Sequence, residues 1–377
     1  MLMRARPYQQ CVRCVMDTSD PEIRFHADGT CNHCSDHLVR MAELAAHGRA
    51  GPQHLDAAIA RIKRLGKGRK YDAVLGISGG VDSSYLALFL KARGVRTLLV
   101  HMDNGWDSAG AVRNIRAVAT KTGFDYASYV LDWAEFRAIQ LAFLKASVVE
   151  AETPTDVAIA GALHRIARQH GVRTIVSASN EASEGILPKL WHYDAKDTRY
   201  LRGIDKRFGS GTIRHLPTFG FATQLWYKVV ARIGSAYLLN YLDYDRATAL
   251  AHLKAELNWQ DYGGKHHESL FTKFVQSYLL PVKFRLDYRK ATFSSLICAG
   301  RMTRAAALEQ LAEPPFDLAD VAEQKTYIAR KLGITADELD VIVDRPGQYY
   351  SDYPNNEKWL SRAYRGYELL GRLRLRA

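Results

Sequence analysis

The sequence predicts an α/β protein: a parallel five-stranded sheet preceded by a cysteine-rich module and followed by a helical region. Short apolar runs alternate with helical segments from Tyr71 to about Phe221. Four of the five cysteines lie within the first 40 residues, and the chain beyond Phe221 is mainly helical and rich in Tyr and Trp. Strands that alternate with helices are typical of parallel sheets covered on both faces.

The division expected along the chain is a four-cysteine module over 1–45, a linker helix over 46–70, the sheet domain over 71–220 and a helical domain over 221–377. In chain order, helices are expected over 55–65, 85–92, 111–120, 132–147 and 157–168, and strands over 72–77, 97–102, 124–131, 174–177 and, as a fifth, 213–216. The helical segments show the apolar spacing of one buried face, and Gly94 and Gly171 end two of them.

Composition excludes some function classes. The chain has 377 residues, 47% of them hydrophobic, and no run of 18 apolar residues, which argues against a membrane span. Its first residues lack the apolar core of a secretion signal, so a cytoplasmic protein is expected. The net charge of +12 favours polyanionic partners, either nucleic acid or an acidic nucleotide-sugar. The positive charges are scattered, and the short basic run over 61–70 fits a solvated linker as well as a nucleic-acid contact, so nucleic acid is not the expected partner.

The first four cysteines predict a metal site. Cys11 and Cys14 form one Cys-x2-Cys pair, Cys31 and Cys34 form another, and sixteen residues separate the pairs, as in a four-cysteine zinc ribbon. Four thiolates leave no open ligand position, so structural Zn²⁺ is expected. An iron–sulfur cluster, unmetallated cysteines and replacement of a ligand by His26, His33 or His37 remain alternatives.

The strongest motif follows the first strand and carries a glycine pair, three hydroxyls and a carboxylate: Ser78-Gly79-Gly80-Val81-Asp82-Ser83-Ser84. Glycines let the backbone approach phosphate oxygens, and the first N–H groups of the following helix are unpaired donors. Asp82 is suited to hold Mg²⁺ or to cap the helix. A Walker loop would need a Lys and a dinucleotide fingerprint a third Gly, so neither fits.

This motif resembles the signature of the N-type ATP pyrophosphatases, or PP-loop enzymes, whose fold is adenine nucleotide alpha hydrolase-like. The resemblance implies that ATP is split to AMP and pyrophosphate, that AMP is placed on a substrate oxygen, and that a nitrogen or sulfur nucleophile displaces it. The ATP-binding residues expected from the loop are Ser78, Gly79, Gly80, Asp82, Ser83 and Ser84.

Two further strand ends are expected in the same crevice, because ligands bind at the carboxyl ends of parallel strands. Asp103 follows the second strand and is a candidate contact for adenine or ribose. Asn180 and Glu184 follow the fourth and are candidates for substrate or magnesium contact. For both loops the alternative is an ordinary polar connection.

The helical region beyond Phe221, here called the third region, narrows the class of PP-loop enzyme. Segments 259–269, 271–284 and 294–304, together with Cys-Val-x-Asp-Thr-Ser-Asp-Pro at Cys14, resemble the N-acetyl sugar amidotransferases of bacterial surface-polysaccharide biosynthesis, including lipopolysaccharide O-antigen. That resemblance implies conversion of an N-acetyl group on a nucleotide-linked sugar to an acetamidino group. It also implies a separate glutaminase subunit that supplies ammonia. Cys298 is expected to be a small buried residue and not a glutaminase nucleophile.

Candidate contacts in this region are Lys265, His266 and Glu268, which could clamp ATP phosphates or the sugar-nucleotide or simply start a helix. Asp82, Lys265 and Glu184 are the expected catalytic residues. Weaker phosphate candidates are Arg285, Lys290, Arg301 and Arg304, and Trp191-His192-Tyr193-Asp194 is a candidate sugar contact or part of the core.

Two rival hypotheses remain. A tRNA-thiolating PP-loop enzyme would share the ATP loop, the basic charge and the zinc module, but usually needs further cysteines in its catalytic domain, and residues 71–297 contain none. A regulatory nucleotide-binding module would keep the loop without turnover.

Overall fold

The computed structural model describes residues 6–260, 264 and 267–374 and is built around one parallel sheet. The sheet order is β3-β2-β1-β4-β5, and every neighbouring pair is parallel. The strands are β1 Ala73–Gly76, β2 Thr97–Asp103, β3 Asp125–Val130, β4 Thr174–Ser177 and β5 Gly234–Tyr237. The central strand β1 is buried at Ala73, Val74 and Leu75, as expected of a strand covered on both faces.

The expected fifth strand over 213–216 is wrong. That segment is a loop, and the backbone N–H groups of Arg214, His215 and Leu216 donate to the carboxylate of Glu135 instead of to a strand. The fifth strand is β5, which pairs with β4 at the edge of the sheet. Its sequence, Gly-Ser-Ala-Tyr, is mostly exposed and carries no apolar run that would mark it.

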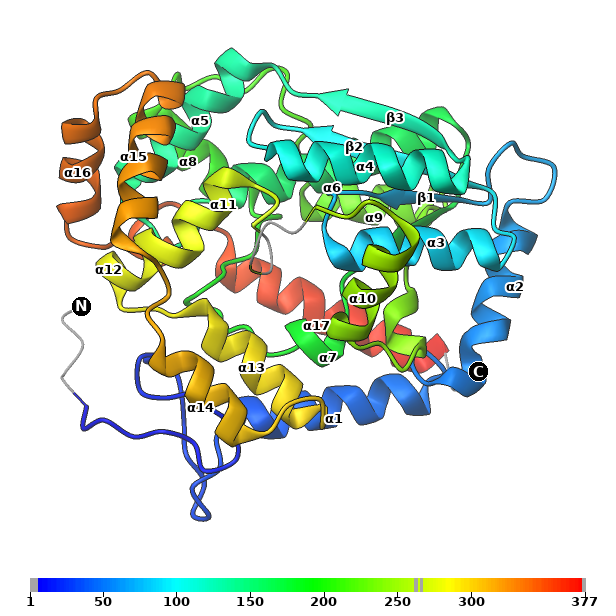
Figure 1. Ribbon diagram of the computed structural model, residues 1–377, viewed down its shortest axis with the longest axis horizontal. Coiled ribbons are helices and arrows are strands. Elements are labelled where there is room, and N and C mark those ends of the chain that lie inside the picture. The colour runs from blue at the N-terminus through cyan, green and yellow to red at the C-terminus, as the bar shows by residue number, and fades with distance from the viewer. Residues whose placement is uncertain (1–5, 261–263, 265–266, 375–377) are drawn as a thin grey trace.

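Two helical layers cover the sheet (Figure 1). On one face lie α2 (Leu55–Leu65), α3 (Val81–Ala92), α4 (Ala109–Thr122) and α10 (Arg246–Glu256), which share a core with β1. On the other face lie α6 (Thr153–Gln169) and α9 (Phe221–Val229). They pack against the strand side chains that point toward that face.

The chain order creates a switch point between β1 and β4. From β1 the chain moves outward through β2 to β3, and then crosses back to place β4 on the other side of β1. Loops that leave β1 and β4 therefore diverge to opposite faces. Open α/β sheets bind ligands at the carboxyl ends of strands at such a point.

The N-terminal module lies on the far side of the molecule from the sheet. In Figure 1, α1 (Asn32–Ala46), α13 (Tyr288–Cys298) and α14 (Arg304–Ala312) form a layer along the lower edge. Arg304 ties the module to α14, because its Nε and Nη2 donate to the carbonyl oxygens of Cys14 and Cys11 at 3.0 and 3.2 Å. Lys290 on α13 pairs with the buried Asp17 at 2.5 Å.

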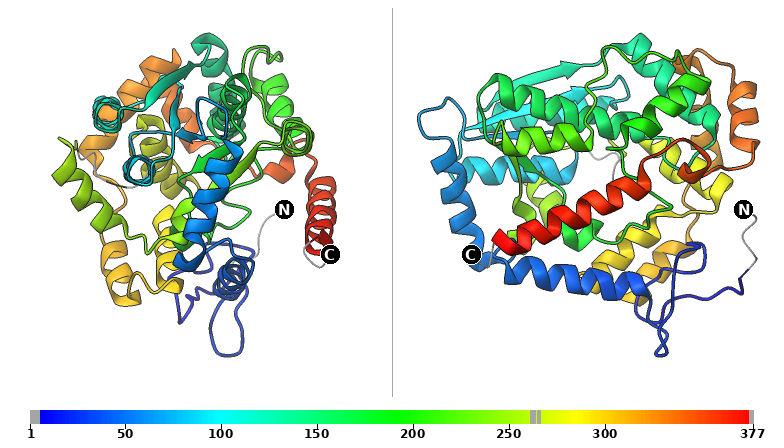
Figure 2. Two further views of the ribbon diagram at one scale, coloured as in Figure 1. Left: turned by 90° about the vertical axis from the view of Figure 1, so that its right-hand side faces the viewer. Right: turned by 180° about the vertical axis from the view of Figure 1, so that it is seen from behind.

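Several of the remaining helices build a third core beside the sheet. This core joins the four cysteines to buried aromatic residues of the middle and the end of the chain, among them Phe143, Tyr200 and Phe274. Figure 2 shows α17 crossing the back of the molecule. The helices and turns not yet named are α5 Trp133–Ala146, α7 Glu181–Glu184, α8 Thr198–Phe208, α11 Leu270–Phe274, α12 Leu280–Phe284, α15 Leu318–Leu332, α16 Ala336–Asp344, α17 Glu357–Arg374, the 3-10 turns η1 Pro52–His54, η2 Leu238–Tyr241 and η4 Tyr350–Asp352, and the π-helical turn η3 Val275–Leu279.

Among the described residues, none of the helices combines the length and the apolar character that crossing a lipid bilayer requires.

Candidate active site

The phosphate-loop motif lies between β1 and α3. Its hydroxyls hold the loop in shape: Ser78 Oγ accepts from the Gly80 N–H at 3.2 Å and lies 3.4 Å from Ser83 Oγ. Ser83 Oγ also donates to the Gly80 carbonyl at 3.3 Å. Gly80 is the N-cap of α3, so the unpaired N–H groups of the first turn lie at the carboxyl end of β1. Such a helix start binds anions.

Gly79 is required by two constraints at once. Its φ is +78°, which favours glycine, and a Cβ there would lie 2.4 Å from the carbonyl oxygen of Ala111 on α4. The buried Asn114, also on α4, donates from Nδ2 to the Gly79 carbonyl at 3.4 Å. The same amide exchanges hydrogen bonds with the backbone of Gln260, 3.0 Å to its carbonyl and 2.9 Å from its N–H. The loop is therefore held against α4 and the segment that leads into the third region.

The third region closes over the loop that follows β2. The Ser108 N–H donates to the Glu268 carbonyl at 2.8 Å, and the Leu270 N–H donates to the Trp106 carbonyl at 2.8 Å. Asp107 and Ser269 form an antiparallel bridge between these two bonds. This short ladder places the Glu268 side chain on the phosphate loop, where Ser78 Oγ donates to its Oε1 at 3.1 Å.

Two carboxylates therefore lie at the loop. Burial raises the pKa of Glu268, and the charge of Asp82 raises it further. Tyr244 donates its hydroxyl to Asp82 Oδ1. A buried carboxylate beside a second carboxylate is stabilised by a cation, and carboxylate oxygens are the ligands that Mg²⁺ prefers. Asp82 and Glu268 are thus the residues suited to hold a metal beside bound phosphates.

A histidine adds positive charge beneath the loop. His101 Nδ1 lies 2.9 Å from the Ile77 carbonyl and its Nε2 lies 2.9 Å from Asp107 Oδ2. Both neighbours can accept a hydrogen bond, an arrangement that favours the protonated ring. Burial opposes this charge, but the hydrogen bond and the charge of Asp107 raise the pKa of His101 above its usual value. A cation at this position favours an anion in the loop.

The candidate residues at the other strand ends lie where they were expected, but they mainly contact residues close to them in the chain. Asp103 ends β2 and accepts from the Gly105 N–H at 2.8 Å. Asn180 follows β4 and caps α7 by accepting from the Ser183 N–H at 3.0 Å, and its buried Nδ2 has no partner among the described residues. Glu184 lies in the last position of α7 and is partly buried. Asn180 therefore has a free donor at the switch point, opposite the phosphate loop.

Lys265 and His266 lie outside the described residues. Their neighbour His267 is described: its Nδ1 accepts from the Gly264 N–H at 3.0 Å, and its Nε2 lies 3.3 Å from Ser277 Oγ. Burial lowers the pKa of His267 to about 4, so the ring is neutral near pH 7.

The weaker phosphate candidates lie in structural contacts away from the loop. Lys290 and Arg304 hold the cysteine module as described, Arg301 pairs with Asp243, and Arg285 is the left-handed residue that ends α12. In the aromatic segment, Trp191 is buried against Tyr288, with 6.1 Å between ring centroids. Tyr193 is stacked on Tyr350 at 4.0 Å and donates to Asp197. Asp194 accepts from Tyr364. His192 is the member of this segment that stays exposed.

The four cysteines form a metal-binding cluster. Their sulfur atoms all lie within 4.8 Å of one another, and the separations of Cys11–Cys34, Cys14–Cys31 and Cys31–Cys34 are 3.9, 3.8 and 3.7 Å. Zn–S bonds of about 2.3 Å in a tetrahedron put sulfurs about 3.8 Å apart. A cubane iron–sulfur cluster is itself larger than a single ion and would hold its four thiolates farther apart. The cluster has the dimensions of a zinc site, and all four thiols are free of disulfides.

The nearby histidines are not ligands in this arrangement. His26 lies 3.0 Å from Ser35 Oγ, His33 pairs with the buried Asp20 at 2.6 Å, and His37 pairs with Glu181 at 3.2 Å. Cys298 is partly buried, and its hydrogen bond with Cys34 lowers the pKa of the Cys298 thiol. It therefore lies beside the metal cluster.

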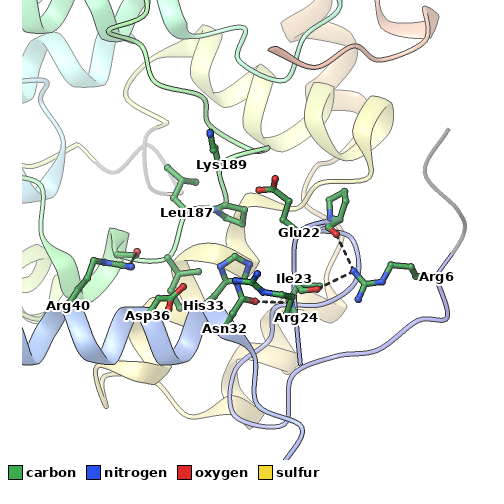
Figure 3. A pocket seen from close by; sticks show the side chains of 14 residues that line it. Arg6, Glu22, Ile23, Arg24, Asn32, His33, Asp36, Arg40, Leu187 and Lys189 are labelled. Atoms are coloured by element: carbon green, nitrogen blue, oxygen red, sulfur yellow. Dashed lines mark hydrogen bonds between the residues drawn. The ribbon is translucent and has the colours of Figure 1, made fainter. Parts of the chain in front are cut away.

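A cavity of roughly 710 Å³ lies between the cysteine module and residues 185–189 (Figure 3). Two of the cationic side chains that line it form ion pairs: Arg40 pairs with Glu181 at 3.0 Å, and Lys189 with Glu357 at 2.5 Å. Arg6 donates to the carbonyls of Pro21 and Ile23. No residue of the phosphate loop lines this cavity, so it is separate from the ATP site.

A second set of titratable side chains, which we call the acidic group, lies around the start of α6. It consists of the carboxylates of Glu150, Glu152 and Asp156 and the imidazole of His192. Tyr200 donates to Glu150 Oε2 at 3.0 Å, Gln276 donates to Glu152 Oε2 at 3.4 Å, and His192 Nε2 lies 3.9 Å from Asp156 Oδ2. Burial raises the pKa of Glu150, Glu152 and Asp156 to about 7 each.

Sequence reasoning missed several of these residues. Asn114 lies in α4 and Tyr244 in the loop before α10, and their contacts with the phosphate loop arise from tertiary packing. Glu152 and Asp156 did carry a signal, because carboxylates at i and i+4 share one helix face without a basic residue between them.

Comparison with known proteins places the third region in a described family. Residues 268–365 match the family model described as "LPS biosynthesis protein WbpG-like, C-terminal domain". The match begins at Glu268, the residue that contacts Ser78. It confirms the resemblance to the N-acetyl sugar amidotransferases of surface-polysaccharide biosynthesis.

Other similarities concern the ATP-binding part. A stretch of 159 residues is 29% identical to tRNA(Ile)-lysidine synthase of Thermus thermophilus and covers 41% of this chain. The match spans only 29% of that relative's length. Among solved structures, the U34-tRNA thiolase NcsA of Methanococcus maripaludis is 12% identical with a TM-score of 0.35 and coverage of 78% and 86% of the two chains. NMN synthetase of Francisella tularensis is 14% identical with a TM-score of 0.32 and coverage of 68% and 91%. The loop motif, the strand order and the family match together indicate an ATP-using PP-loop enzyme.

The close approach of Gly79 to α4 predicts a difference between two glycine substitutions. Gly79→Ala must accept both a left-handed backbone and a contact with the Ala111 carbonyl, and should lower the free energy of unfolding by about 2–4 kcal/mol. Gly68→Ala is the matched control, because Gly68 has φ +76° but open space around it, and should cost about 1 kcal/mol. Urea unfolding measures both. Equal losses for the two variants would show that contact with α4 does not constrain the loop.

The raised pKa of Glu150 predicts a stability change with pH. In the unfolded chain this carboxyl ionises near its ordinary value of 4.5, whereas in the fold its pKa is about 7. Wild-type stability therefore falls as pH rises from about 4.5 through 7. Glu150→Gln removes that cost and should be more stable than wild type by roughly 1–3 kcal/mol at pH 8, with little difference below pH 4.5. Thermal unfolding of both proteins from pH 4 to 8 measures the difference, which must grow with pH and level off above 7. A constant difference would contradict this account.

Proposed function

Starting from a WbpG-like domain joined to a PP-loop ATP site, we propose that this protein is an ATP-dependent amidotransferase. It converts an N-acetyl group of a nucleotide-linked sugar to an acetamidino group in bacterial surface-polysaccharide biosynthesis, including lipopolysaccharide O-antigen. The observation that carries the proposal is the hydrogen bond from Ser78 to Glu268. It joins the ATP loop to the first residue of the region that matches the polysaccharide family.

The loop supplies the first chemical requirement, which is a good leaving group. An amide carbonyl resists attack by ammonia because resonance lowers its electrophilicity and oxide leaves poorly. Transfer of AMP to the acetamido oxygen removes both obstacles and releases pyrophosphate. The N–H groups at the start of α3, with the Ser78 and Ser83 hydroxyls, are positioned to bind that pyrophosphate. The cationic His101 lies beneath them.

Mg²⁺ is expected beside the phosphates, held by Asp82 and Glu268, where it would offset the charge that develops on pyrophosphate. The four-cysteine cluster is assigned to structural Zn²⁺, since its sulfur spacing fits that ion and four thiolates leave no ligand position open.

Ammonia is expected from a separate glutaminase subunit. Hydrolysis of glutamine needs a nucleophilic thiol and a base. The chain has five cysteines, of which four form the metal cluster and Cys298 lies beside it. None follows a strand of the sheet, where a glutaminase nucleophile of this domain would have to act.

The second candidate is a tRNA-modifying enzyme. The match to tRNA(Ile)-lysidine synthase and the net charge of +12 favour it. Two observations count against it: the third region matches a polysaccharide family, and the sheet domain has no cysteine that could carry sulfur.

We expect the purified protein, given ATP, Mg²⁺ and ammonium salt, to form AMP with at least one member of a panel of nucleotide-linked N-acetyl sugars. The product mass should fall by about one unit as oxygen is exchanged for NH. Asp82→Asn should lower pyrophosphate release at least about 100-fold. Asp243→Asn is the control, because that carboxylate is 85% exposed and pairs with Arg301 on the surface.

The same assay includes bulk tRNA in place of the sugars. Stimulation of AMP formation by tRNA, with no response to any sugar, would replace the amidotransferase proposal with the tRNA-modifying one. If Asp82→Asn binds ATP normally and wild type releases no pyrophosphate under any condition, the protein is a nucleotide-binding module.

A further inference from the structure

Four helices, α6, α8, α9 and α17, share one side of the molecule. The view from behind in Figure 2 shows α17 running across this side. The guanidinium of Arg168 in α6 lies 4.9 Å from the ring centre of Trp226 in α9. At the start of α9, the ring of Phe221 lies 5.2 Å from that of Trp359 in α17. The N-cap carboxylate of α8 accepts from the Asn356 N–H, just before α17. The four helices therefore form one continuous surface.

The charge of this surface is one-sided. Over the side chains that the structure describes in these helices, every lysine and arginine is exposed, whereas none of the three acidic residues is. Asp205 is buried, Asp156 is half-buried, and Glu357 pairs with Lys189 at 2.5 Å. We call the cationic set the basic face, and it consists of Arg165, Arg168, Arg199, Arg202, Lys206, Arg207, Lys228, Lys358, Arg362 and Arg365. The net charge of +12 is thus concentrated in part on one side of the protein.

Large apolar side chains are exposed among these charges. Val229 and Val230 are 61% and 63% exposed, and Leu225 and Trp226 are 42% and 39% exposed. Their spacings of three and four residues place them on one side of α9. Trp359 of α17 is also exposed, at 55%. Apolar groups that gather on a surface and are surrounded by polar residues mark an interaction site.

The combination of charge and apolar groups decides which partner fits. A second copy of this chain does not, because two basic faces would repel each other. A nucleic-acid backbone would pair with the cations but would leave Val229 and Val230 without an apolar contact. An anionic lipid bilayer supplies both kinds of contact, since headgroup phosphates attract Lys and Arg and the acyl boundary accepts aliphatic side chains and Trp.

We propose that the basic face binds the surface of an anionic phospholipid bilayer, with the exposed apolar side chains of α9 inserted between the headgroups. Peripheral binding of this kind needs no membrane-spanning helix. The helix α3, which starts at the phosphate loop, lies on the opposite side of the sheet from α6 and α9. Binding through the basic face therefore leaves the α3 side of the molecule open to solvent. The inference concerns where the protein acts and does not rest on the proposed amidotransferase function.

Sedimentation with lipid vesicles tests the proposal on the full chain, without ATP or sugar. Wild type should bind vesicles that contain phosphatidylglycerol and phosphatidylcholine, and should not bind vesicles of phosphatidylcholine alone. Raising the salt to about 0.5 M should weaken binding at least about tenfold, because the contacts with headgroup phosphates are screened.

A single substitution tests insertion of the apolar groups. Val229→Asp should weaken binding to the anionic vesicles at least about fivefold, because a carboxylate is costly near acyl chains and is repelled by anionic headgroups. Val341→Asp is the matched control, since Val341 is 56% exposed on α16, outside the four helices, and should bind as wild type does. Thermal unfolding of both variants verifies that the fold is intact.

Two pairs of arginines test the role of the cations. Arg165→Gln combined with Arg168→Gln removes two charges from α6 and should weaken vesicle binding at least about fivefold. Arg113→Gln combined with Arg116→Gln removes two exposed charges with the same spacing from α4, on the other side of the sheet, and should leave binding unchanged.

Several outcomes would overturn the proposal. Absence of binding to anionic vesicles, or equal binding to neutral ones, would exclude an anionic bilayer as the partner. Equal weakening by the two arginine pairs would assign binding to overall charge, and unchanged binding by Val229→Asp would exclude insertion of α9. If the protein binds tRNA but not vesicles, and Arg165→Gln with Arg168→Gln weakens that binding, the basic face is a nucleic-acid contact. A dimer that Val229→Asp dissociates would make α9 a contact between copies.

Discussion

The hydrogen bond from Ser78 to Glu268 is the contact on which the functional architecture depends. A phosphate loop alone specifies only that ATP is bound. The short ladder between residues 106–108 and 268–270 fixes Glu268 against that loop, and with it the entire WbpG-like region. Because Glu268 is buried and lies near Asp82, the contact places two carboxylates where pyrophosphate would leave. This arrangement is unfavourable without a cation, which is a reason to expect metal-dependent chemistry there.

The sheet separates two regions that differ in charge. The loop after β1 leads to α3 on one face, where helical N–H groups and the cationic His101 favour anions. The first turn of α6 lies on the other face, where carboxylates favour a cation. The two regions meet at the switch point between β1 and β4.

Most of the fold was predictable because its signals are local. Apolar runs identify β1, β2 and β4, and the helix over 55–65 has the expected bounds. The fifth strand was misplaced, since β5 is an exposed edge of small residues, whereas 213–216 is an apolar-flanked loop whose N–H groups are bound by Glu135. A strand that depends on its neighbour for pairing leaves little trace in its own sequence.

The candidate site was predictable only where the functional side chains and the backbone positions that hold them lie in one short segment. The phosphate loop and the cysteine pairs meet that condition, because glycine, hydroxyl and thiol positions define their own geometry. Asn114 and Tyr244 do not, since each contacts the loop through tertiary packing that no spacing rule describes. The acidic group was missed for a related reason: desolvation, which raises the proton affinity of Glu152 and Asp156, is a property of the folded protein.

The central claim is that the phosphate loop serves to place AMP on the acetamido oxygen. The most direct measurement uses the reactive nucleotide-linked sugar with ¹⁸O in its N-acetyl carbonyl and follows that oxygen by mass spectrometry. The account predicts that the label appears in the phosphate of AMP, one atom for each acetamidino product. Label found in water or inorganic phosphate, or formation of ADP in place of AMP, would contradict it.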